Sequence, residues 1–154
     1  ATAWAPAPTW PTWALLATIG AWVAVIDAIT TWIPAVLAWT GWAGWIGAVV
    51  VTALSDHTAA IRAVIATAII FAAWMIAWLI SRGGFGFSDV RITPLWAAPA
   101  AATGIDTIHA TVIAGLTLIA LYALIDRFRH HTTRFLPWAP SLCSGALIGL
   151  AIAH

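Results

Sequence analysis

The sequence predicts an all-α membrane protein, a bundle of about six transmembrane helices that forms a single domain over residues 1–154. Hydrophobic residues make up 63% of the 154 residues and charged residues only 7%, whereas a soluble domain carries about 25% charged residues. Several apolar runs approach the ~20 residues that a helix needs to cross a bilayer. At that length per span, the chain accommodates about six crossings.

The borders of the expected spans follow from prolines and polar residues. Pro6, Pro8 and Pro11 argue against a helix over residues 1–12. Pro34 marks the break after the first span, because proline disfavours helical backbone at the residue before it. The expected spans are residues 10–30, 35–54, 63–80, 90–105, 107–125 and 135–153.

The connections between these spans differ in character. The polar residues from Ser55 to Arg62 predict a loop, and residues 126–134 are predicted to form the most basic loop of the chain. The run from Ile92 to Ile105 is only fourteen residues long and contains Pro94 and Pro99. We expect a kinked helix that begins near Asp89 to carry this segment across.

The arginines predict an orientation. With six spans, five of the six arginines fall on one face of the membrane, in or beside the Gly-rich stretch 83–88 and in the basic stretch 126–134. The positive-inside rule makes that face cytoplasmic. Asp27, at the end of the first span, and Asp89, after the Gly-rich stretch, then lie at the same depth on the cytoplasmic side.

Two carboxylates at one membrane interface suit aspartic-protease chemistry. Like charges a few ångströms apart cannot both ionise, so the pair shares a proton. The ionised member can deprotonate a water while the protonated member polarises a scissile carbonyl. Interfacial aspartates also cap helices or pair with arginine, as Asp89 could with Arg91. From the residues alone, both interpretations stay open.

Three stretches resemble the motifs of the type IV prepilin peptidases, the GxGD-type membrane aspartic peptidases. Residues 27–34, from Asp27 to Ile33-Pro34, resemble the first aspartate motif, in which polar residues and then Ile-Pro-Asn follow the aspartate. Residues 86–92, Gly-Phe-Ser-Asp-Val-Arg-Ile, resemble GxGD followed by Val-Lys-Leu. Residues 136–142, Leu-Pro-Trp-Ala-Pro-Ser-Leu, resemble the Ile-Pro-Phe-Gly-Pro-Phe-Leu signature of the last helix.

The resemblance implies catalytic roles for Asp27 and Asp89. It also implies a set of residues that shape the loops or bind substrate: Pro34, Gly84, Gly86, Ser88 and Arg91. The implied reaction is removal of a basic leader from type IV pilin-like precursors at the cytoplasmic face of a bacterial inner membrane. The partners are then the leader and first apolar helix of the precursor and the lipid bilayer.

We expect no cofactor, no metal and no nucleic acid partner. The formal net charge is +1, and the single cysteine, Cys143, excludes a CxxC zinc site. The N-terminal cysteine-rich domain of the longer, bifunctional family members is absent, so the resemblance is to a minimal, peptidase-only form without methyltransferase activity.

Two other functions stay open. Ala35, Ser88 and Ala139 depart from the family patterns, which permits a catalytically inactive scaffold or assembly protein. A small transporter with the aspartates on an ion path is the second alternative. A transporter should show repeated halves or broken helices around a midplane site, and the sequence has no convincing repeat.

Overall fold

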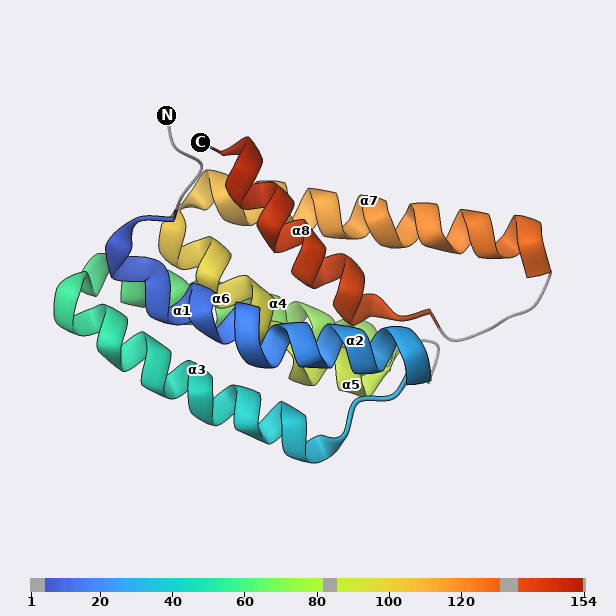
Figure 1. Ribbon diagram of the computed structural model, residues 1–154, viewed down its shortest axis with the longest axis horizontal. Helices are drawn as coiled ribbons and strands as arrows, with labels where there is room; N and C mark the ends of the chain where they lie inside the picture. The colour runs from blue at the N-terminus through green and yellow to red at the C-terminus, as the bar shows by residue number, and fades with distance from the viewer. Residues whose placement is uncertain (1–4, 82–85, 131–135, 154) are drawn as a thin grey trace.

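A computed structural model describes residues 5–81, 86–130 and 136–153, with the backbone alone for residues 129 and 130. All regular elements in these ranges are helices (Figure 1). In chain order they are a 3-10 turn (Ala7–Thr9), α1 (Trp10–Leu15), a π-helical turn (Leu16–Gly20), α2 (Ala21–Thr30), α3 (Ala35–Ser55), α4 (His57–Ser81), α5 (Phe87–Arg91), α6 (Thr93–Thr103), α7 (Ile105–His130) and α8 (Trp138–Ile152).

Four helical segments in the described part of the chain are long and apolar enough to cross a membrane. They are Ala7–Thr30, Ala35–Ser55, His57–Ser81 and Ile105–Phe128. The predicted all-helical fold is therefore confirmed, but by length and composition only four of the about six expected spans are candidate membrane spans among the described residues. The two remaining expected spans correspond to α6, with 11 residues, and α8, with 15 residues.

The helical structure begins earlier than the prolines of residues 1–12 suggest. A 3-10 turn starts at Ala7 and runs directly into α1 at Trp10. Pro8 and Pro11 lie in the first turns of these two elements, where a missing N–H breaks no intrahelical hydrogen bond. The expectation that residues 1–12 are not helical is thus wrong from Ala7 onwards.

The predicted polar loop from Ser55 to Arg62 is also wrong, because only Asp56 separates α3 from α4. The Asp56 carboxylate accepts the N–H of Ala59 at 2.8 Å, which caps the start of α4. Arg62 lies inside α4 and donates hydrogen bonds to the carbonyls of Ala101 (3.4 Å) and Ala102 (2.8 Å). The last turn of α6 therefore lies beside the first turns of α4.

The basic stretch 126–134 is not wholly a loop either, since α7 continues to His130. Arg134 and the rest of residues 131–135 lie outside the described residues.

Helix α6 forms the centre of the bundle. Every residue from Thr93 to Ala102 is buried. Trp96 packs with Leu16 and Leu142, which come from the first and last helical segments. Because protein rather than lipid surrounds α6, this helix does not need the apolar length of a lipid-facing span.

Small residues bring α7 and α8 into close contact. Gly145 and Gly149 of α8 lie against Thr111 and Gly115 of α7. A Cβ on Gly145 would lie 2.7 Å from the Gly115 backbone nitrogen and 2.8 Å from the Thr111 carbonyl oxygen. Small residues four apart allow backbones to approach in this way in membrane helix pairs. Helix α8 lies between α7 and α2 and contacts both (Figure 1).

Gly145→Ala tests this contact. The added methyl group meets backbone atoms that cannot rotate away, so we expect a loss of about 1–3 kcal/mol of stability. Thermal unfolding in detergent measures the effect. The matched control is Gly47→Ala in α3, where a Cβ has nothing within 4 Å and helix propensity favours alanine by about 1 kcal/mol. Equal unfolding temperatures for the two variants would contradict the assignment of this contact.

Candidate functional site

Asp27 lies in the last turn of α2 and is 2% exposed. The turn ends at Thr31, whose φ of 53° is left-handed and whose N–H donates to the Asp27 carbonyl at 2.8 Å. A β-branched residue rarely adopts this conformation. The strained C-cap therefore fixes the chain direction immediately after the buried acid.

The start of α8 holds the Asp27 side chain. The Ala139 N–H donates to Asp27 Oδ2 at 2.9 Å, and the Trp138 backbone also hydrogen-bonds this carboxylate. The first N–H groups of a helix have no intrahelical acceptor, and the positive end of the helix dipole attracts a carboxylate. Asp27 thus joins the first membrane span to the last helix of the chain.

Asp89 lies on the short helix α5 and is 5% exposed. Its N–H donates to the Gly86 carbonyl at 3.1 Å, which closes the first turn. Gly86 has an ordinary extended backbone with φ of −73°, so this position does not need glycine for its dihedral angles. A Cβ there would lie 2.8 Å from Asp89 Oδ2, so a larger residue would displace the Asp89 carboxylate.

Aromatic contacts fix α5 to the neighbouring helices. The ring of Phe87 lies 5.0 Å from the ring of Trp78 on α4. The Trp42 indole N–H on α3 donates to the carbonyl of Arg91 at 3.0 Å. These contacts hold both ends of α5, so its one acid has a defined position.

The structure brings Asp27 and Asp89 to the same region of the bundle. Val23, one turn before Asp27, and Ile92, three residues after Asp89, belong to one buried cluster that also contains Ala139. Burial, and to a lesser degree the neighbouring Asp27 carboxylate, raise the pKa of Asp89 to about 7. The two acids therefore interact electrostatically, although 62 residues separate them in the sequence.

The other predicted site residues have simpler positions. Pro34 is the N-cap of α3, and Ser88 lies half-buried on α5 beside Asp89. The Arg91 guanidinium lies 5.2 Å above the Phe87 ring. Among the described residues, Arg91 forms no ion pair with Asp89. The Asp89–Arg91 pair that their spacing suggested is therefore not formed. Gly84 lies outside the described residues.

Sequence reasoning missed the backbone donors of α8 as site residues. Residues 136–142 resemble a family motif, but the side chains of Trp138 and Ala139 predict no role at the acids. A detectable signal is the pair Pro137 and Pro140, which marks a helix start and therefore a set of free N–H groups. Within the described ranges, no group of three or more His, Cys, Asp or Glu side chains could hold a metal ion.

Comparison of the chain with protein-family models, with curated proteins and with solved structures finds no match.

The raised pKa of Asp89 predicts a pH dependence of stability. The folded protein holds this proton up to about pH 7, whereas an unfolded chain releases it near pH 4. The unfolding free energy should therefore fall as the pH rises from about 4 to about 7, by up to about 4 kcal/mol. Thermal unfolding in detergent across this range measures the slope.

Asp89→Asn should reduce that slope, because asparagine does not titrate. Asp106→Asn, which changes an exposed acid at the start of α7, should retain it. A wild-type stability that rises over this pH range would contradict the assignment.

Proposed function

We propose that this protein is a membrane aspartic endopeptidase that removes the basic leader from type IV pilin-like precursors at the cytoplasmic face of a bacterial inner membrane. One observation carries the proposal. Asp27, the segment Gly86–Asp89 and the start of α8 come from three distant parts of the sequence and meet at one buried site. These are the three stretches whose residue patterns resemble the motifs of the prepilin peptidases.

The surroundings of the two acids assign them different roles. Asp27 accepts backbone N–H groups from the start of α8, and such donors stabilise a carboxylate charge. Burial and the neighbouring Asp27 carboxylate raise the pKa of Asp89 to about 7, so about half of the molecules hold a proton on Asp89 at neutral pH. For the mechanism we therefore assign the shared proton to Asp89 and the ionised form to Asp27.

The reaction follows from these protonation states. Asp27 takes a proton from a water molecule, whose oxygen attacks the scissile carbonyl carbon while the Asp89 O–H donates to the carbonyl oxygen. The tetrahedral intermediate then collapses. The C–N bond breaks, the leaving amine receives the proton held by Asp27, and Asp89 regains its own.

The proposal includes six membrane crossings. Arg62 near the start of α4 contacts the end of α6, while α5 follows the end of α4, so α5 and α6 run back along α4 through the bundle. Gly149 near the end of α8 lies against Thr107 and Thr111 near the start of α7. Helix α8 therefore runs back along α7 from the site of Asp27. When the α5–α6 segment and α8 each count as a membrane crossing, most arginines lie on the same side as the two acids. The positive-inside rule makes that side cytoplasmic.

Cysteine labelling tests this orientation. In a Cys143→Ser background, Trp32→Cys should react with a membrane-impermeant maleimide only after the cytoplasmic face is opened. Thr58→Cys should react from outside in intact cells. Both native side chains are exposed and lie in or beside the connections at opposite ends of α3. Labelling of position 32 from outside would invert the topology and separate the acids from cytoplasmic leaders.

Substitution of the acids tests the chemistry. Asp27→Asn and Asp89→Asn keep side-chain size and hydrogen-bonding capacity but remove the ionisable group. Each should lower the rate of precursor cleavage by about 10²–10⁴-fold. The double variant should be no slower than the single variants, because the two acids act as one unit. The assay is incubation of membranes that contain the protein with pilin-like precursors from the same genome.

Asp106→Asn, at the opposite end of the bundle, is the matched control and should cleave at the wild-type rate. Cleavage at the wild-type rate by either Asp27→Asn or Asp89→Asn would contradict the catalytic role assigned to that residue. If the wild-type protein cleaves no precursor, an inactive scaffold related to these peptidases becomes the better interpretation of the same site.

A further inference from the structure

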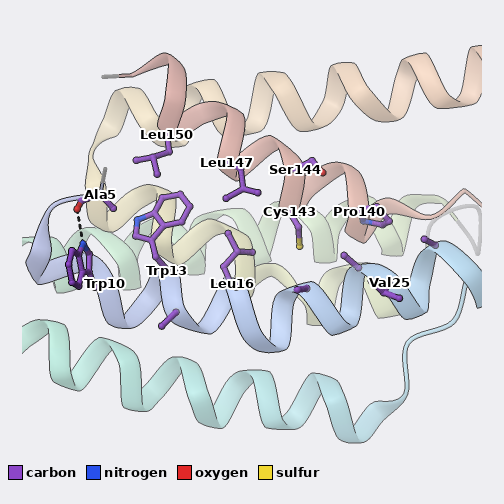
Figure 2. A pocket seen from close by; sticks show the side chains of 15 residues that line it. Ala5, Trp10, Trp13, Leu16, Val25, Pro140, Cys143, Ser144, Leu147 and Leu150 are labelled. Atoms are coloured by element: carbon purple, nitrogen blue, oxygen red, sulfur yellow. Dashed lines mark hydrogen bonds between the residues drawn. The ribbon is translucent and has the colours of Figure 1, made fainter. Parts of the chain in front are cut away.

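An apolar groove of about 830 Å³ runs between the first span and α8 (Figure 2). On one side lie residues from Trp10 to Ala28, and on the other lie residues from Pro140 to Leu150. Figure 2 shows Trp13 and Leu16 on one wall, with Leu147 and Leu150 on the other. Neither of the two acids lines the groove, but one end of the groove lies beside Asp27.

The walls of the groove offer almost no hydrogen bonds to an occupant. The Trp10 indole N–H already donates to the Ala5 carbonyl at 2.8 Å, and the Trp13 indole N–H donates to Thr103 Oγ1 at 2.9 Å. Among the described residues that line the groove, Ser144 alone carries a hydroxyl. A peptide that enters must therefore satisfy its own backbone groups, and in an apolar medium a single segment does so as an α-helix.

The length of the groove also matches a membrane-spanning helix. From Trp10 to Ala28 the wall extends about 27 Å at 1.5 Å per residue, close to the ~30 Å hydrocarbon core of a bilayer. A lipid acyl chain belongs to one leaflet and reaches about half of this depth. A helix of about 20 residues would fill the whole length.

The first span presents small side chains to the groove. Ala14, Ala17, Ala21, Ala24 and Ala28 line it at alternating intervals of three and four residues. This spacing keeps them on one helix face. Small residues on such a face let a second helix backbone approach closely.

The groove is continuous with the proposed catalytic site. Ala28 follows Asp27 directly, and Pro140 follows Ala139, whose N–H holds the Asp27 carboxylate. We infer that this groove binds the apolar transmembrane helix of the peptidase's single-span substrate and delivers the peptide bond before that helix to the two acids. The inference rests on the proposed function for the identity of the partner.

Photo-crosslinking tests the groove without any need for cleavage. The probe is a synthetic peptide with a short Lys-containing leader and about twenty Ala and Leu residues, one of them a diazirine-bearing leucine analogue. It is reconstituted with the full-length protein in phosphatidylcholine vesicles, and mass spectrometry maps the adducts. We expect the adducts to concentrate on the first span and α8, at about tenfold the yield on α4.

A matched pair of variants controls for lipid-facing surface. Ala21→Leu fills the groove at an exposed position and should lower the adduct yield about tenfold. Ala72→Leu makes the same change at an exposed position on α4 and should leave the yield unchanged. Adducts spread evenly over α3 and α4, as expected if lipid alone fills the groove, would overturn the inference. So would an unchanged yield in Ala21→Leu with an unaltered unfolding temperature.

The design separates the groove from the chemistry. Asp27→Asn should keep the adduct yield while it loses cleavage. If adducts concentrate in the groove but the wild-type protein cleaves no precursor, the groove inference stands and the peptidase proposal fails. If precursors are cleaved without concentrated adducts, the peptidase proposal stands and the groove inference fails.

Discussion

The hydrogen bond from the Ala139 N–H to Asp27 Oδ2 joins α8 to α2 through two residues that are 112 positions apart in the sequence. A buried carboxylate without partners would be strongly destabilising in an apolar bundle, and hydrogen bonds to a charged group contribute roughly 1.5–3 kcal/mol each. The start of α8 supplies these donors only if α8 lies beside the end of α2. This requirement sets the depth of α8 against the first span, and the groove between the two helices starts at the same point. Site and groove therefore share one structural cause.

Much of the fold could be predicted because apolar runs and helix breakers are local signals. The break at Pro34, the helices on either side of it and the long apolar α4 follow directly from residue type. The two acids could be singled out because a carboxylate between apolar segments is rare. Their common location depends on non-local packing, which the residues around Asp27 and Asp89 do not encode by themselves.

Other features could not be predicted because their cause lies in a distant part of the chain. Arg62 resembles a loop residue until the carbonyls at the end of α6 are available to it. Thr93 to Ala102 resemble a poor membrane span, since only the bundle around them removes the need for contact with lipid. Ala139 carries no side-chain signal at all, because it acts through its backbone N–H. The groove likewise forms only once α8 is placed.

The buried helix α6 has a consequence for biosynthesis. It is short, begins and ends in threonine and contains Pro94 and Pro99, so it offers a translocon far less apolar surface than the helices before and after it. On the proposed six-crossing topology, α6 enters the membrane with its partners rather than alone. A nascent chain in which it failed to enter would give α7 and α8 the opposite orientation and leave the Asp27 carboxylate without its donors. Only a correctly inserted chain can therefore form the hydrogen bonds between the start of α8 and Asp27 that complete the site.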